Sequence, residues 1–406
     1  MMPSFFKNLS TEVKQYLLIT GNYWAFTLTD GALRMLVILY FHQLGYSPLQ
    51  IAMLFLFYEF FGVVTNLIGG WLGARLGLNK IMNIGLFLQV VALVMLLVPT
   101  SMLSIVWVMA AQALSGIAKD LNKMSAKSSI KSLVIADQQG QLYQWVALLT
   151  GSKNTLKGIG FFLGGLLLTL VGFKGAILSM AVALFVVWVM SMHNLKKDLG
   201  KAKNKPTFSE MFSKSPSINY LSAARLFLFA SRDVWFVVAL PVFLSTQLQW
   251  SHSKIGGFIA LWIIGYGIIQ SLAPKFTGKG SGTIPNGRTI ALWAFSLSGI
   301  PALIALAMYF NTHQEAVIVI GLFIFGGIFA INSSLHSYLI ICYANDDAVS
   351  MDVGFYYMAN ALGRLSGTIL SGWLYQLYGL TACLMMSSIF ILLSAFISLA
   401  LPKQHY

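Results

Sequence analysis

The chain has 406 residues, of which 57% are hydrophobic and 9% are charged, whereas about 25% of the residues of a soluble domain are charged. This composition excludes a soluble globular fold. The net charge of +14 would suit a nucleic-acid-binding protein only if the basic residues were gathered on one surface. The two cysteines, Cys342 and Cys383, fall in apolar stretches, which indicates neither a disulfide framework nor a thiolate metal site.

Short polar breaks divide the chain into about twelve apolar stretches, each near the roughly 20 residues that a membrane-spanning helix needs. In chain order they are residues 17–41, 49–72, 81–99, 102–118, 142–171, 174–192, 219–246, 255–275, 289–310, 316–341, 353–378 and 380–401. The first stretch is too long for a cleaved signal peptide and lacks a small-residue cleavage site, so we expect it to remain. The sequence therefore predicts an all-α integral membrane protein with twelve transmembrane helices.

The basic residues are distributed unevenly between the loops. Of 26 Lys and Arg residues, 18 fall on one set of alternate loops and on the chain ends, while the opposite loops hold only Lys174 and Lys254. The positive-inside rule then places both termini in the cytoplasm, with the basic loops beside anionic lipid, and makes a nucleic-acid partner unexpected. Four of these residues form a helical stripe that could guide anions, although we favour a basic face that faces lipid or sets the orientation of the chain: Lys119, Lys123, Lys127 and Lys131.

The longest polar stretch, residues 193–216, is predicted to be a cytoplasmic linker between six-helix halves at 1–192 and 217–406. Comparing the halves at a shift of about 204 to 207 residues gives weak but ordered matches, as expected of the internal repeats of transporters. The glycine-rich stretches that begin at Leu156 and Gly363 match each other. Seven of their glycines are expected to permit close helix packing: Gly158, Gly160, Gly164, Gly165, Gly363, Gly367 and Gly372. The match aligns Gly165 with Gly372, Gly172 with Gly379 and Lys157 with Arg364.

Twelve helices in two pseudo-symmetric six-helix halves resemble the major facilitator superfamily, and so does the loop after the second predicted helix. The family signature there is Gly, three positions, an acid, Arg or Lys, one position and Gly. The stretch GWLGARLGLNK fits it at Gly70, Arg75, Gly77 and Lys80. Ala74 stands where the family has the acid, which removes the carboxylate of the usual gate interaction.

A closer resemblance covers nearly the whole chain. The strings SRDVWFVVALPVFL and VGFYYMANALGRLSGTILSGWLYQ, with the stretch that starts NYWAFTLTDGALRMLV, are similar to the ArsJ-type organoarsenical efflux permeases. The resemblance implies export of 1-arseno-3-phosphoglycerate, an arsenate ester made by a glyceraldehyde-3-phosphate dehydrogenase acting with arsenate. We accordingly expect a multi-pass protein of the bacterial inner membrane, monomeric and without a cofactor.

Six cations and three acids fall inside the predicted spans, where a charge is costly unless it is paired or faces water. They are Arg34, Lys153, Lys157, Arg225, Arg232 and Arg364, with Asp30, Glu59 and Asp233. They occupy predicted helices one, two, five, seven and eleven, mostly near mid-span, where transporter sites lie. Arg offers phosphate, arsenate or carboxylate a bidentate fork, and Lys offers a point charge. The pattern predicts a cationic cavity for an anionic substrate.

Structural roles compete with substrate binding for several of these residues. Asp30 with Arg34 could form an intrahelical ion pair, and Arg232 and Asp233 could each pair with a neighbouring helix. Arg225 lies nearest the cytoplasmic end of its span and could snorkel. The acids that remain in the cavity could instead carry the coupling proton.

Three cations have no acid on their own predicted helices, and for these we favour substrate contact: Lys153, Lys157 and Arg364. Glu59, on the second helix, could still pair with one of them. Because the repeat aligns Lys157 with Arg364, we predict that these two residues hold the two anionic ends of one substrate.

The predicted function is a secondary active transporter, an antiporter that exports an anionic organoarsenical by alternating access, and not an enzyme. The alternative is a transporter or exchanger of phosphate esters or other organic anions. A membrane enzyme for phosphorylated lipids would need a base such as His336, and a transport-silent sensor would bind its ligand without flux. The sequence contains no phosphate loop, metal cluster or catalytic triad.

Overall fold

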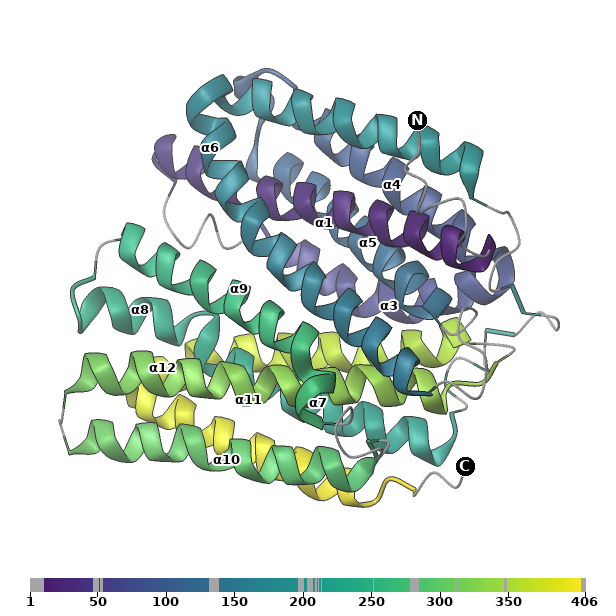
Figure 1. Cartoon of the computed structure of the whole chain (residues 1–406). Coiled ribbons are helices and arrows are strands. Elements are labelled where there is room, and N and C mark those ends of the chain that lie inside the picture. Colours follow the sequence, from purple (N-terminus) through teal and green to yellow (C-terminus); the bar gives the residue numbers. More distant parts are fainter. Residues whose placement is uncertain are drawn as a thin grey trace. The chain divides into compact units, whose positions relative to one another are not determined.

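The computed structural model in Figure 1 describes residues 11–46, 51, 54–130, 139–195, 201–202, 207–208, 210, 212, 214–250, 252–277, 285–310, 313–346 and 349–402. The regular structure of this part of the chain is entirely helical. The two chain ends that are predicted to be cytoplasmic, most of the 193–216 linker, Lys131 and Lys279 lie outside the described residues.

The helices are α1 (Thr11–Gln43), α3 (Leu56–Leu76), α4 (Leu78–Met95), the 3-10 turn η2 (Thr100–Met102), α5 (Ile105–Ser129), α6 (Gln139–Asn194), α7 (Pro216–Phe236), α8 (Ala239–Thr246), α9 (His252–Thr277), α10 (Gly287–Tyr309), α11 (Gln314–Tyr343) and α12 (Val349–Leu399). In the described part of the chain, eight stretches are long and apolar enough to cross a membrane. One of them, Pro216–Thr246, joins α7 and α8 as the sequence predicts.

Two of these stretches are double spans. Helices α6 and α12 contain 56 and 51 residues, more than twice what one bilayer crossing requires. Each is broken at one glycine: Gly172 has φ 69° and ψ 178°, and Gly379 has φ 75° and ψ −173°. Figure 1 shows α6 turning back on itself. With both helices folded in two, the described helices agree with the twelve transmembrane helices expected from the sequence.

The helices form two compact units. The first consists of Met1–Gln138, Leu156–Ser213 and Ala344–Phe355. Within it, α5 packs against α1, α3 and α4. Helix α6 meets α1 at glycines, where a Cβ at Gly160 would lie 2.6 Å from a carbonyl oxygen of α1. The expected role of this glycine in close helix packing is therefore confirmed.

The second unit consists of Gln139–Thr155, Lys214–Tyr343 and Tyr356–Tyr406. Helix α11 packs against α7, α9 and α10. Aromatic rings of α7, α9 and α11 meet in stacked or edge-on contacts. The buried members of this aromatic core are Trp235, Trp262, Tyr266, Phe325 and Phe329.

Two helices divide between the units. The first turns of α6 belong to the second unit, where Asn154 Nδ2 donates to Gln270 Oε1 at 2.7 Å. The first turns of α12 belong to the first unit, where Ser350 Oγ donates to the Gly70 carbonyl oxygen at 2.7 Å. A Cβ at Gly354 would lie 2.9 Å from the Gly70 Cα, so this contact requires small residues. The division into halves at 1–192 and 217–406 stays a prediction.

Candidate functional site

Helix α7 carries three of the predicted site residues and begins with strong local signals. Ser215 caps it by accepting a hydrogen bond from the Ile218 amide, and Pro216 occupies the first helical position. Ser is a favoured N-cap residue. Pro is favoured at the first helical position because the amide hydrogen that it lacks would have no acceptor within the helix. The start of α7 therefore follows from its sequence, and it fixes the positions of the arginines that follow.

The contact between α7 and α12 brings three predicted site residues together. Gly363 and Gly367 pack so closely on α7 that a Cβ at Gly367 would lie 2.7 Å from a carbonyl oxygen of that helix. Arg364 consequently reaches α7, and its Nε donates to Asp233 Oδ2 at 3.1 Å. Arg232 Nε donates to Asp233 Oδ1 at 2.6 Å. One carboxylate therefore holds two guanidinium groups.

This group, Arg232, Asp233 and Arg364, is called the α7–α12 triad below. The Asp233 side chain is 1% exposed, whereas those of Arg232 and Arg364 are 15% and 29% exposed. The triad carries a net charge of +1, and its accessible atoms belong mainly to the cations. Arg364 was expected to bind substrate because no acid lies on its own helix, but α7 supplies the acid.

Arg225 lies two turns before Arg232 on the same helix and is 3% exposed. Its Nε donates to Asn360 Oδ1 at 2.8 Å, and its Nη1 donates to both the carbonyl oxygen and Oγ of Ser333 at 3.1 Å. The guanidinium carbon lies 4.0 Å from the centre of the Phe229 ring. Arg225 is therefore buried among neutral partners and does not snorkel, contrary to the alternative left open by the sequence.

A polar chain leads away from Arg225 through the second unit. Ser333 Oγ also accepts a hydrogen bond from Gln270 Nε2 at 3.2 Å, and Gln270 Oε1 accepts the bond from Asn154. Lys153 precedes Asn154 on α6 and is half-buried. The described part of the second unit thus gathers four of the predicted cations on α6, α7 and α12.

The first unit contains a separate group of charges on α1 and α3. Arg34 Nη2 lies 3.2 Å from Glu59 Oε1, and both side chains are partly exposed. Asp30, which is buried, accepts a hydrogen bond from the Tyr58 hydroxyl at 2.7 Å. The Tyr58 ring also lies 5.1 Å from the Arg34 guanidinium and 3.9 Å from the Lys119 ammonium. In the described structure Asp30 and Arg34 use partners on α3, and the intrahelical ion pair is not formed.

Helix α5 adds charges that the sequence analysis placed in a loop. It runs to Ser129, well beyond the predicted end at residue 118. Lys123 Nζ lies 2.5 Å from Asp120 Oδ1, Lys119 Nζ lies 3.8 Å from Oδ2, and Lys127 is 2% exposed. The expectation that these lysines face lipid is therefore wrong.

Asp120 is a buried acid that was missed. The available signal was its spacing of three residues from Lys123 within a run that lacks Gly and Pro after Gly116.

The remaining predicted cation, Lys157, is half-buried on α6, and its Nζ lies 5.8 Å from the Phe161 ring centre. A Cβ at Gly31 of α1 would lie 2.8 Å from the Lys157 carbonyl oxygen, so the close approach of α1 positions this turn of α6. Lys157 belongs to the first unit and Arg364 to the second. The predicted bridging of one substrate by these two residues stays a prediction.

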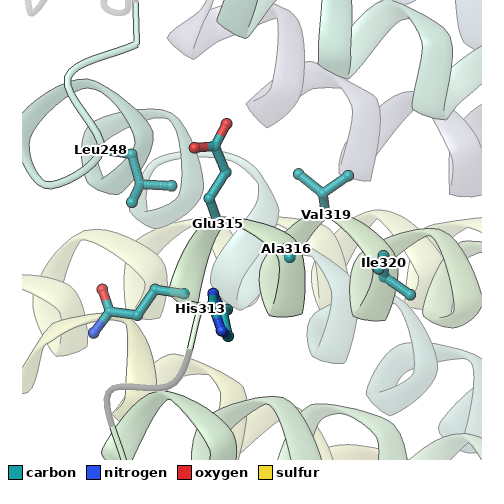
Figure 2. Close-up of a pocket in the computed structure, with 7 residues that line it drawn as sticks. Leu248, His313, Glu315, Ala316, Val319 and Ile320 are labelled. Atoms are coloured by element: carbon teal, nitrogen blue, oxygen red, sulfur yellow. The ribbon is translucent and has the colours of Figure 1, made fainter.

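The pocket in Figure 2 lies at the start of α11 and has a volume of about 610 Å³. Its lining consists of Leu248, His313, Gln314, Glu315, Ala316, Val319 and Ile320. None of the predicted site residues is among them. Glu315 is the charged member of this lining, and it accepts hydrogen bonds from Lys254 at 2.8 Å and Trp250 at 3.1 Å. A carboxylate would repel an anion, so this pocket does not suit the predicted substrate.

Comparison with known proteins identifies the family. The sequence profile of the Major Facilitator Superfamily matches residues 19–344. The chain belongs to this superfamily. Membership of the superfamily makes the chain a multi-pass membrane protein and points to a transporter rather than an enzyme.

Solved structures of other transporters share the fold at low sequence identity. The human organic anion transporter TETRAN is 17% identical with a TM-score of 0.77, over 96% of this chain and 100% of that one. The fucose:proton symporter of E. coli is 10% identical with a TM-score of 0.75, over 97% and 100%. A bacterial homologue of the iron transporter ferroportin is 16% identical with a TM-score of 0.72, over 96% and 99%. A search of curated proteins found no match.

Proposed function

We propose that this chain is a secondary active transporter that exports an anionic organoarsenical, 1-arseno-3-phosphoglycerate, from the bacterial cytoplasm by antiport. The observation that carries the proposal is the excess of positive charge within the second unit. Four cations, Lys153, Arg225, Arg232 and Arg364, occur there with one carboxylate among them, Asp233. This concentration of positive charge at membrane depth is electrostatically complementary to an anionic cargo.

The chemistry of the cations suits an ester of pentavalent arsenic. Such esters resemble phosphate esters in geometry and charge, and guanidinium groups bind both in bidentate fashion. Trivalent arsenic would instead require thiolates, and the chain contains only Cys342 and Cys383. The similarity of long strings to the ArsJ-type permeases supports the arsenate ester over the alternative cargo, a phosphate ester or other organic anion.

The proposed cargo requires a functional partner. A glyceraldehyde-3-phosphate dehydrogenase that accepts arsenate would make the ester, and the transporter would remove it before it hydrolyses back to arsenate. The inward gradient of an ion, with Asp30, Glu59 or Asp233 as the carrier of a proton, would drive export. We propose a monomer in the inner membrane with both termini in the cytoplasm.

Arsenate resistance tests the proposal. An arsenate-sensitive bacterium would express the transporter alone, the dehydrogenase alone, or both, and growth would be measured against arsenate concentration. Resistance that requires both proteins supports the ester as cargo. Resistance from the transporter alone points to another arsenic species, and no resistance in any strain favours the phosphate-ester alternative.

A further inference from the structure

Two arginines of α7 flank one aromatic ring. Arg225, Phe229 and Arg232 are spaced by four and three residues and therefore share one face of the helix. The guanidinium carbons of Arg225 and Arg232 lie 4.0 Å and 4.9 Å from the centre of the Phe229 ring. Their helix positions differ by about 10 Å along the axis. The second unit thus presents two cationic positions, one before and one after the ring.

The two positions differ in how their charge is neutralised. After the ring, Arg232 and Arg364 share the carboxylate of Asp233. Before the ring, Arg225 donates only to neutral groups, and its Nη2 donates to no acceptor within the described residues. A buried charge without a counter-charge is strongly unfavourable, so the Arg225 position is suited to an anion from outside the chain.

Hydrogen bonds within the chain preorganise the polar groups around Arg225 for binding of an anion. Asn360 and Ser333 fix the orientation of the guanidinium group, and Gln270 in turn binds Ser333. His336 is fully buried, lies one turn after Ser333 on α11, and has no partner for either ring nitrogen in the described part of the chain. An anion bound here could accept hydrogen bonds from Arg225 Nη2 and from the imidazole.

We propose that Arg225, Asn360 and His336 form an anion subsite that is separate from the α7–α12 triad. The two subsites bind the two ends of one substrate that carries an anionic group at each end of a short carbon chain, with the Phe229 ring between them. The inference rests on the proposed transport of an organic anion, and it adds selection of cargo with two charged ends over cargo with one. The pairing of Arg364 with Lys157 is the competing arrangement.

Binding of two stable probes to the purified full chain tests this subsite. 3-Phosphoglycerate has a phosphate and a carboxylate end, whereas glycerol 3-phosphate has only the phosphate, and calorimetric titration gives both affinities. Wild-type protein should prefer the two-ended probe. Arg225→Met should weaken binding of that probe by about 30-fold or more, the scale of losing one partner of a buried charge pair, with little change for the one-ended probe.

Asn360→Asp is the variant that keeps the fold. It places a carboxylate beside Arg225 Nε, so it should raise the melting temperature and still abolish the preference for two charged ends. The proposed subsite would be refuted if Arg225→Met and Asn360→Asp both kept the preference for the two-ended probe. It would also be refuted if Lys157→Met, and not these two variants, lost that preference. Binding of neither probe to wild-type protein would instead count against the proposed transport of these anions altogether.

Discussion

Gly172 and Gly379 adopt the same backbone conformation at positions that the internal repeat aligns. Their φ values are 69° and 75°, and their ψ values are 178° and −173°. This region of conformational space is essentially restricted to glycine. A Cβ at either position would have no neighbour within 4 Å, so a side chain there would be opposed by backbone strain and not by crowding. A glycine in this conformation therefore divides each of α6 and α12 into two spans.

Alanine at these turns should therefore destabilise the protein. Gly172→Ala and Gly379→Ala should each lower the free energy of unfolding by about 1 to 3 kcal/mol. The matched controls are Gly165→Ala and Gly372→Ala, which lie in the same two helices where a Cβ meets at most an ordinary contact with Leu39. Alanine is more favourable than glycine in a helix interior, so the control substitutions should be neutral or stabilising. Equal thermal unfolding of all four variants in detergent would refute this account.

A second prediction concerns the glycine contact that places Arg364 beside Asp233. A Cβ at Gly363 would overlap the Leu226 carbonyl oxygen of α7, so Gly363→Ala should push α12 away from α7. We expect a loss of about 1 to 3 kcal/mol in stability from overpacking, together with weaker substrate binding. Gly372→Ala, which faces open space, provides the control. Thermal unfolding and probe affinity would be measured on both variants, and unchanged affinity in Gly363→Ala would contradict the expectation.

Arg364 should contribute to substrate affinity through the planar geometry of its guanidinium group as well as through its charge. Arg364→Ala should weaken ester binding by about 2 to 5 kcal/mol, and Arg364→Lys should be partly tolerated because a point charge replaces a fork. The measurement is binding and flux in purified, monodisperse variants. Lys254→Ala, which removes a cation bonded to Glu315 outside the predicted cavity, should bind normally. Near-normal affinity of Arg364→Ala would assign the residue a structural role.

The buried or partly buried acids should matter for the driving force. Asp30→Asn, Glu59→Gln and Asp233→Asn remove the proton-accepting carboxylate while keeping most of the side-chain shape. In liposomes, at least one of them should reduce transport driven by a pH gradient more than it reduces exchange without a gradient. Asp120→Asn, in the α5 cluster, tests the acid that the sequence analysis missed. Full pH-driven transport by all four variants would exclude a carboxylate as the proton carrier.

The orientation of the chain can be measured directly. In a background with Cys342 and Cys383 replaced by alanine, a cysteine introduced into the 193–216 linker should react with a membrane-impermeant reagent only after the cells are opened. Lys254→Cys lies on the predicted opposite side, and the native side chain is 52% exposed, so it should react in intact cells. Labelling of the linker in intact cells would reverse the predicted topology.

The sequence was informative wherever one local property decided the structure. Hydropathy located the spans and placed two of the breaks between them at Gly172 and Gly379, where the structure has the positive φ that glycine permits. The stretch after residue 118 misled the prediction, since a stripe of lysines is typical of an exposed face. The structure instead buries Lys127, which is 2% exposed. That burial depends on neighbours distant in the chain and has no local signature.

Ion-pair partners were equally hard to predict. Asp30 and Arg34 have the spacing of an intrahelical pair. Asp30 instead accepts a hydrogen bond from Tyr58, and Arg34 pairs with Glu59, both on α3. Arg364 finds its acid on α7 because two glycines allow the helices to touch. The charged residues within the predicted spans therefore indicate which side chains could bind a substrate. The contacts between helices decide which of their atoms remain available to it.

The division of α6 and α12 between the units constrains the order of folding during synthesis. Residues Ala344–Phe355, which belong with the first unit, emerge from the ribosome long after the rest of that unit. Residues Gln139–Thr155 emerge before the remainder of the second unit and must wait for α9, where Gln270 binds Asn154. Neither unit can therefore complete its contacts until most of the chain has been made. A chain cut within the linker would yield two fragments, each missing a segment of its own unit, which could mature only by exchanging those segments.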